Sequence, residues 1–182
     1  RLSIKTLHAD RMPDAHLSLM RAAQGDRRIV ITDSHLRRED MAALIERADA
    51  YVSLHRSEGF GLGMAEAMAL GKPVVATVYS GNEDFMSGRE ACTVEYRMAP
   101  VPAGAYPHGQ GQQWAEPDIG HAARQMRRLV DDPAFAAGLG AAARARIRRQ
   151  YAPSACAGAV IKRLGAIAAE WPLRPNPPAD RE

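Results

Sequence analysis

The stretch SLHRSEGFGLGMAEAMALGKPVVAT, Ser53–Thr77, combines the end of an apolar strand, a glycine-rich loop, a helix and a second strand. Glu58 enters the loop directly before the glycines, and Glu66 lies about one turn into the predicted helix. A glycine loop that opens a helix leaves backbone N–H groups without partners, and these groups and the helix dipole attract anions. The stretch therefore predicts an anion-binding loop that is accompanied by two carboxylates.

Strand and helix signals alternate around this stretch, from residue 1 to about residue 97. Alternating or β-branched apolar runs predict strands, and apolar residues at helical spacing predict helices. The predicted strands are 1–7, 27–33, 50–55, 72–79 and 91–96, and the predicted helices are 14–25, 37–48 and 63–70. Such alternation is typical of parallel β-α-β units. The predicted fold is α/β, a Rossmann-like doubly wound parallel sheet with helices on both faces.

The rest of the chain loses this alternation. Recurring prolines and glycines predict an irregular surface loop over residues 98–117, and residues 118–170 predict C-terminal helices in three segments, broken near Pro133 and Pro153. We expect one domain over residues 1–170 and a disordered tail over 171–182. Because the chain begins inside a strand-like run and without methionine, we expect it to be a piece of a longer protein.

Composition narrows the function classes. With 46% hydrophobic and 25% charged residues among 182, the chain suits one globular domain. Its net charge of +3 is too small to indicate a nucleic-acid partner. Cys92 and Cys156 have neither paired nor CxxC spacing, and the histidines have no metal-ligand spacing. We therefore expect reduced thiols, no bound metal and, without a signal peptide or a membrane-length apolar run, a cytoplasmic location.

Three kinds of site compete for the glycine loop. A dinucleotide fingerprint needs a glycine where Met64 stands and an acid at the end of the next strand, where residues 77–79 carry none. A P-loop places its lysine before the helix, whereas Lys72 follows the helix. A nucleotide sugar fits better, because carboxylates accept hydrogen bonds from sugar hydroxyls and the loop amides suit a diphosphate. An NAD-dependent oxidoreductase domain and a non-catalytic nucleotide-binding module stay open as alternatives.

The segment SEGFGLGMAEAMALGKPVVAT, residues 57–77, closely resembles the E-x7-E stretch of retaining glycosyltransferases with the GT-B fold. More narrowly, it resembles the family 4 enzymes that include bacterial mannosyltransferases of polysaccharide assembly, over about residues 1–150. The resemblance implies that Glu58 contacts the donor hexose, that Glu66 contacts the ribose, and that the amides of Phe60–Leu62 face the sugar and the diphosphate. It also implies that this chain is the C-terminal, donor-binding domain and that an N-terminal domain with acceptor contacts is missing.

The resemblance predicts transfer of a hexose, with mannose as the first guess, to a saccharide or lipid-linked acceptor with retention. The donor substrate would be GDP-mannose or a UDP-hexose, with no separate cofactor, and the isolated domain would be inactive. Glu58 is the predicted catalytic residue. The predicted substrate-binding residues are Lys5, Ser34, His55, Arg56, Glu58, Gly59, Phe60, Gly61, Leu62, Glu66, Ser80, Gly81 and Asn82. Ser80–Asn82 stand where many family members have a Gly-Gly loop, and the modest basic charge is compatible with peripheral association at the inner face of a membrane.

Overall fold

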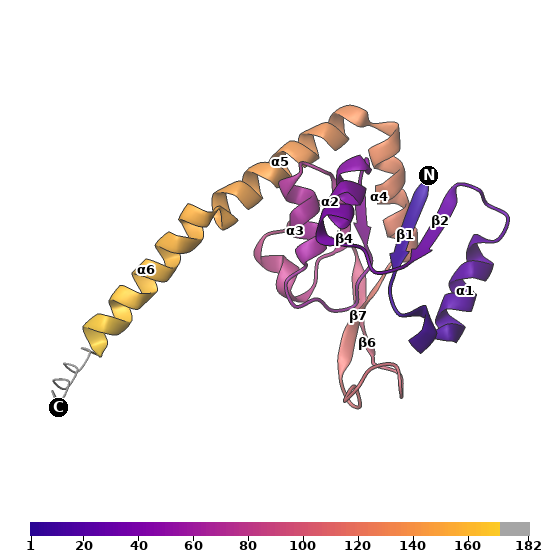
Figure 1. The fold of residues 1–182 in the computed structure, drawn as a ribbon, viewed down its shortest axis with the longest axis horizontal. Helices are drawn as coiled ribbons and strands as arrows, with labels where there is room; N and C mark the ends of the chain where they lie inside the picture. Colours follow the sequence, from indigo (N-terminus) through magenta and orange to yellow (C-terminus); the bar gives the residue numbers. More distant parts are fainter. Residues whose placement is uncertain (172–182) are drawn as a thin grey trace, which may run out of the picture. The chain divides into compact units, whose positions relative to one another are not determined.

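The computed structural model describes residues 1–171 of the chain (Figure 1). It divides the chain into two compact units, Arg1–Leu44 and Ile45–Glu182. Both units contain parallel strands with helices between them. The prediction that residues 1–170 form one domain stays a prediction, and the predicted tail lies outside the described residues except for Trp171.

The first unit is a single β-α-β element. It contains β1 (Leu2–Thr6), the short 3₁₀ helix η1 (Ala9–Arg11), α1 (Pro13–Ala23) and β2 (Ile29–Asp33). β1 and β2 pair in parallel, with Leu2 opposite Ile29. Pro13 stands at the start of α1, where its missing N–H costs nothing. Gly25, with φ of 84°, follows the helix, as its position in the sequence predicts.

The second unit is built on a three-stranded parallel sheet in the order β3-β4-β5. Its elements are α2 (Arg38–Arg47), which crosses the unit boundary, β3 (Tyr51–Ser53), α3 (Leu62–Ala69), β4 (Val74–Thr77), η2 (Ser80–Asp84) and β5 (Cys92–Val94). β4 is the central strand, and all four of its residues are fully buried. This is the expected pattern for a parallel strand that is covered on both faces.

Helices cover both faces of this sheet. Val75 packs in one cluster with Cys92 and with Leu129 of α4 (Ile119–Asp131). Because side chains alternate along a strand, Val74 and Ala76 point to the opposite face, and they are equally buried. On α3 the residues Met64, Ala67 and Met68 are buried, whereas Glu66 is exposed. The predicted alternation of strands and helices is therefore confirmed in this unit.

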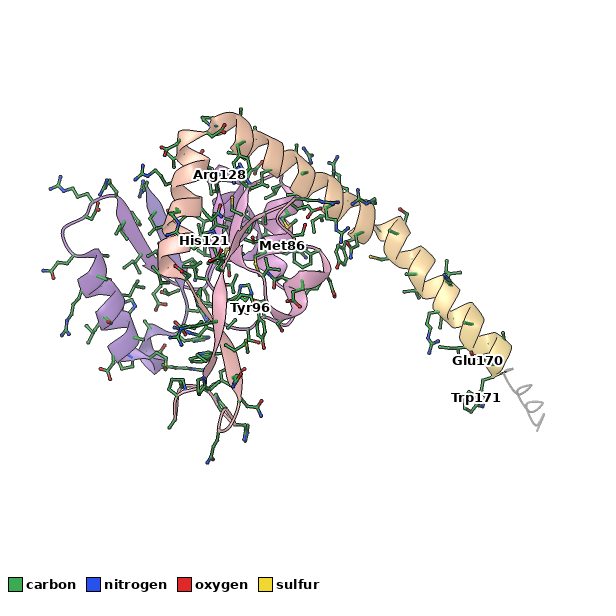
Figure 2. The ribbon with its side chains drawn as sticks, turned by 180° about the vertical axis from the view of Figure 1, so that it is seen from behind. Met86, Tyr96, His121, Arg128, Glu170 and Trp171 are labelled. Atoms are coloured by element: carbon green, nitrogen blue, oxygen red, sulfur yellow. The ribbon has the colours of Figure 1, made fainter. Side chains whose placement is uncertain are left out.

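Three C-terminal helices follow, with breaks at the predicted prolines. α4 leads to α5 (Pro133–Tyr151) and then to α6 (Pro153–Glu170). The Asp132 carboxylate accepts a hydrogen bond of 2.8 Å from the backbone N–H of Phe135 and so caps α5. α6 has no buried residue and extends away from the rest of its unit to Glu170 and Trp171 (Figures 1 and 2).

The prediction of an irregular loop over residues 98–117 is wrong at both of its ends. β6 (Tyr96–Pro100) and β7 (Gln113–Pro117) form an antiparallel hairpin that projects from the second unit (Figure 1). Pro100 and Pro117 occupy the last rungs of its ladder, where proline is tolerated. Only Val101–Gln112 between the strands is irregular. The pairing was missed because its two partners are separated by this long connection and share no local pattern.

Candidate functional site

The glycine loop after β3 touches the loop after β4 through their backbones. The N–H of Gly81 donates a hydrogen bond of 3.0 Å to the carbonyl of Glu58. A Cβ at Gly81 would collide with the carbonyl of Gly59, so only glycine permits this approach. Gly61 precedes the first helical residue of α3 with φ of 91°, a left-handed conformation that favours glycine. The glycines therefore serve one compact junction at the carboxyl ends of two parallel strands.

The first turn of α3 opens toward this junction. The first intrahelical bond runs from Ala65 N–H to the carbonyl of Gly61, at 2.9 Å. The N–H groups of Leu62 and Gly63 come before that bond and have no acceptor within the helix. They provide the donors and the dipole end that the sequence predicts for binding an anion.

A cluster of aromatic side chains supports the glycine loop through Phe60. The ring of Phe60 lies 5.1 Å from that of Phe85 and 5.4 Å from that of Tyr151, measured between centroids. Phe85 is completely buried. Phe60, predicted as a backbone contact, thus also anchors the loop through its side chain. No local pattern in the sequence indicates this role, because Phe85 and Tyr151 come from distant elements.

Tyr51 brings the two predicted glutamates into one environment. Its hydroxyl lies 2.5 Å from the place that a Cβ on Gly63 would take, directly beneath the first turn of α3. Burial raises the pKa of Tyr51, and the negative charges of Glu58 and then Glu66 raise it further. Both carboxylates are therefore within electrostatic reach of one hydroxyl. Tyr51 was not predicted, although a phenol in an apolar strand is a signal that was available.

Glu58 and Glu66 differ in exposure. Glu58 is partly buried, and its Cγ lies 3.5 Å from the position of a Cβ on Gly61. Glu66 is exposed on α3. Neither carboxylate has a side-chain hydrogen bond or ion pair among the residues that the structure describes, so both keep free acceptor oxygens.

The segment Ser80–Asn82 has an unusual backbone and a buried amide. Ser80 is exposed and has φ of 74°, which explains why a glycine suits this position. The side chain of Asn82 is completely buried, and its Nδ2 donates to the carbonyl of Thr77 at 2.9 Å. Asn82 Oδ1 and Thr77 Oγ1 are buried and have no hydrogen-bond partner among residues 1–171. The Asn82 side chain therefore supports the loop from inside.

His55 connects the ends of β3 and β4. Its Nδ1 lies 3.2 Å from Ser53 Oγ, and its Nε2 lies 3.4 Å from the carbonyl of Tyr79. The ring of Tyr79 stacks edge-on against that of Tyr96, with centroids 5.4 Å apart. His55 is partly buried at the junction and adjoins the β6–β7 hairpin through Tyr79.

Arg56 binds the hairpin. Its Nε and Nη2 donate to the two carboxylate oxygens of Glu116 at 2.6 and 2.8 Å. Its guanidinium carbon lies 4.8 Å from the ring centre of Trp114. The Arg56 carbonyl accepts a bond of 3.0 Å from Ala115 N–H. The hydrogen bonds from Arg56 lower the pKa of Glu116, and the same pair raises the pKa of Arg56. None of these partners was predicted.

Lys5 and Ser34 belong to the first unit. Lys5 lies in β1 opposite Thr32 and is partly buried, with Nζ donating to the Thr6 carbonyl. Ser34 follows β2 and is exposed. The other predicted residues lie in the second unit.

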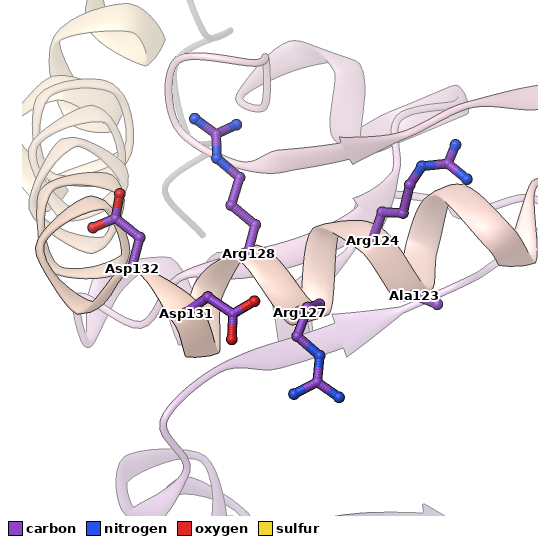
Figure 3. A pocket seen from close by; sticks show the side chains of 6 residues that line it. All are labelled: Ala123, Arg124, Arg127, Arg128, Asp131 and Asp132. Carbon is purple, nitrogen blue, oxygen red and sulfur yellow. The ribbon is translucent and has the colours of Figure 1, made fainter.

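A surface hollow on α4 is separate from this site. Figure 3 shows its lining, which consists of Ala123, Arg124, Arg127, Arg128, Asp131 and Asp132. Arg128 stacks on Phe135, with 3.6 Å between the guanidinium carbon and the ring centre. No residue of the glycine loop lines this hollow. Within residues 1–171 no group of side chains could hold a metal ion, and no helix has the length and apolarity of a membrane span.

Solved structures of glycosyltransferases share the fold. Sucrose-phosphate synthase from Thermosynechococcus elongatus aligns with a TM-score of 0.60 and 22% identity, over 86% of this chain and 35% of that chain. The HepE protein of Anabaena, solved in complex with UDP-glucose, aligns with a TM-score of 0.64 and 16% identity, over 89% and 40%. The C-terminal domain of a glycosyl transferase group 1 family protein from Francisella tularensis aligns with a TM-score of 0.56 and 18% identity, over 79% and 64%.

These likenesses confirm the predicted α/β fold of the GT-B type. The chain spans only 35% and 40% of the first two structures. Among proteins with curated descriptions, none matches the chain. The family described as glycosyl transferases group 1 matches residues 9–101, more than half of the chain, including the whole E-x7-E stretch. The chain therefore belongs to the glycosyl transferases group 1 family.

Proposed function

We propose that this chain binds the nucleotide diphosphate sugar donor of a retaining hexosyltransferase. The observation that carries the proposal is the open first turn of α3, with the free carboxylate of Glu58 in the loop before it and that of Glu66 exposed on the helix. A nucleotide sugar offers hydroxyls at two places with a diphosphate between them. Two acceptor groups flanking a set of backbone donors match that order.

The proposed roles follow the chemistry of each group. Glu58 accepts hydrogen bonds from the hexose, and Glu66 accepts them from the ribose. The amides from Phe60 to Gly63 face the diphosphate, where they stabilise the charge that develops as it leaves. Glu58 is the proposed catalytic residue in the sense that it touches the reacting sugar. The donor substrate itself brings the leaving group, so the proposal includes no separate cofactor.

The identity of the donor is a further part of the proposal. GDP-mannose is the first candidate because of the resemblance of residues 57–77 to mannosyltransferases. A UDP-hexose is the second candidate, and the complex of the similar Anabaena protein with UDP-glucose supports it. The acceptor is proposed to be a saccharide or a lipid-linked saccharide, held by the part of a longer enzyme that this chain does not cover. A cytoplasmic location, which is compatible with peripheral association at the inner face of a membrane, completes the proposal.

The first experiment is a thermal-shift panel on the intact protein with GDP, UDP, ADP, GDP-mannose, UDP-glucose and NAD. A ligand that binds only the folded state adds about 2.7 kcal/mol of stability at a hundredfold excess over Kd. We expect a selective shift with either guanine or uracil compounds. A shift with NAD alone would support an oxidoreductase domain and overturn the proposal.

Variants then assign the two acids. Glu66→Gln is expected to weaken the binding of nucleoside diphosphate and nucleotide sugar alike, because the ribose is common to both. Glu58→Gln is expected to weaken the binding of the nucleotide sugar but not of the nucleoside diphosphate, and to abolish hexose transfer. Glu46→Gln, an exposed acid on α2, is the matched control. The same titrations on variants of six further residues test their predicted contacts: Lys5, Ser34, His55, Ser80, Gly81 and Asn82. Nucleotide-sugar binding without transfer to any acceptor would favour the non-catalytic module.

A further inference from the structure

We propose that Arg56 is a positioning residue that locks the β6–β7 hairpin to the loop carrying Glu58, and that it does not bind the diphosphate of the donor. We call Arg56, Glu116 and Trp114 the clamp. The inference rests on the proposed function, because it assigns the clamp to the orientation of Glu58 toward the donor. It also gives the hairpin, which the sequence did not predict, a task at the site.

Three contacts converge on Arg56. The guanidinium makes a two-pronged pair with Glu116, at 2.6 and 2.8 Å, and lies over the indole of Trp114. The carbonyl of Arg56 receives the N–H of Ala115, the residue between the two clamp partners. Side chain and main chain of one loop residue are thus both held by β7. A parallel two-bond geometry is the strong form of an arginine–carboxylate pair.

The guanidinium of Arg56 already has binding partners within the protein. Side-chain exposure is 47% for Arg56 and 29% for Glu116, so the pair is partly shielded from water. Glu116 lies opposite Arg97 across the hairpin ladder, and the positive charge of Arg97 helps to keep Glu116 ionised. A diphosphate that engaged Arg56 would have to displace the charge-assisted bonds to Glu116 and would leave that carboxylate beside it. The arrangement therefore favours a structural use of Arg56.

The clamp acts two residues before Glu58. On its other side Glu58 is held through its carbonyl by the N–H of Gly81. The loop between β3 and α3 is therefore fastened to β7 at Arg56 and to the β4 loop at Glu58. Without the side chains of the clamp, the attachment to β7 keeps only the main-chain bond from the N–H of Ala115 to the carbonyl of Arg56. The hairpin keeps its own ladder, so the fold persists while the direction of Glu58 becomes less defined.

The test compares Arg56→Ala, Glu116→Ala and the double variant in the intact protein. Each single variant is expected to weaken nucleotide-sugar binding or lower kcat about tenfold, within the range of coupling in one contact network. The double variant is expected to be no worse than either single variant. Affinity for the nucleoside diphosphate without its sugar is expected to stay within about threefold, because its proposed contacts are the α3 amides and Glu66.

Direct binding of the diphosphate by Arg56 gives the opposite pattern. In that case Arg56→Ala strongly weakens the binding of the nucleoside diphosphate, while Glu116→Ala leaves that binding unchanged or strengthens it. This result overturns our inference. Arg28→Ala is the matched control, because it removes an arginine whose Nε and Nη2 donate to the two carboxylate oxygens of Asp26. All variants are compared at equal folded fraction, determined from their melting curves.

A second readout separates this inference from the proposed function. Amide exchange at Ala115 reports the link to Arg56 without any donor, and it is expected to quicken in Arg56→Ala. If the wild-type protein binds no nucleotide sugar, the proposed function and the positioning role are both overturned, even where exchange shows that the clamp exists. If the wild type binds its donor and both clamp variants bind and turn over equally well, only the positioning role is overturned.

Discussion

A glycine makes a close backbone contact at each end of helix α3, and the two contacts have different roles. At its beginning, Gly81 approaches the carbonyl of Gly59 so closely that a Cβ would collide with it. At its end, Gly140 of α5 approaches the carbonyl of Gly71 in the same way. We call the first contact the site junction and the second the core junction. The site junction adjoins the candidate binding residues, whereas the core junction joins two helices.

A close glycine contact therefore does not by itself mark a functional site. Gly71 stands just after α3 with φ of 75° and so ends the helix, as its sequence position predicts. Its partner Gly140 is buried in α5, and no predicted site residue is near it in the sequence. The same restriction of the backbone fixes the helix at one end and shapes the candidate binding loop at the other.

We expect the greatest loss of stability when the aromatic cluster next to the site junction is disrupted. Phe85→Ala is expected to lower the free energy of unfolding by about 3–5 kcal/mol, since it leaves a cavity under Phe60. Denaturant unfolding of the intact protein measures this. Tyr151→Phe keeps the ring and is the control. A loss below about 1 kcal/mol for Phe85→Ala would show that the cluster does not support the loop.

Substitution at the two junctions tests the contrast directly. Gly81→Ala and Gly140→Ala are each expected to lower the free energy of unfolding by about 2–3 kcal/mol, because the Cβ forces two backbones apart. Donor titration of the folded fraction is expected to separate them. Gly81→Ala should weaken donor binding, whereas Gly140→Ala should leave it unchanged. Equal donor affinities in the two variants would show that the two junctions do not differ in function.

A weaker effect is expected from loss of the N-terminal cap of α5, the helix that carries Gly140. Asp132→Ala removes the side chain that caps α5 and is expected to cost about 1 kcal/mol of unfolding free energy. Donor affinity should not change, because this end of the molecule serves only the core junction. Asp131→Ala, at an exposed neighbouring position, is the control, and an equal loss in both variants would argue against a capping effect.

Ser80→Gly is expected to have a small stabilising effect at the site junction. The left-handed backbone conformation of Ser80 costs a residue with a side chain about 1–2 kcal/mol of stability. Glycine avoids this cost, but its greater freedom in the unfolded chain lowers the stability by roughly 0.5–1 kcal/mol. The net gain is therefore about 0.5–1 kcal/mol, readable as a higher melting temperature. Ser57→Gly, at an exposed position without a left-handed φ, should lose stability. A decrease for Ser80→Gly would contradict the strain at this residue.

A pH profile distinguishes the charged clamp from the uncharged junctions. Arg56 holds the pKa of Glu116 below its ordinary value of 4.5. A carboxyl whose pKa is lowered by folding stabilises the protein above its ordinary pKa and loses this contribution as the pH falls through the lowered value. The stability difference between wild type and Glu116→Gln is thus expected to be constant from neutral pH down to about pH 5 and to vanish in stronger acid. The effect of Gly140→Ala should show no such dependence.

The β3-α3-β4 region could be predicted from the sequence because its signals are local. The apolar strands, the glycines at the two ends of α3 and the spacing of Glu58 and Glu66 all lie within residues 50–79. The helix breaks at Pro133 and Pro153 could be predicted for the same reason. The hairpin could not, because β6 pairs with a strand beyond a long connection that is rich in glycine and proline.

The α/β class, the order of the parallel strands and their helices, and the family resemblance follow from the sequence alone, which also predicts an anion-binding loop with two acids. These properties depend on residue types at short, fixed spacings, where the chain geometry leaves few choices. Only the tertiary structure decided that Tyr51 lies under α3, that Phe60 is anchored by Phe85 and Tyr151, and that Arg56 pairs with Glu116, 60 positions away. Such contacts depend on how distant elements pack, and no local pattern specifies which side chains then meet.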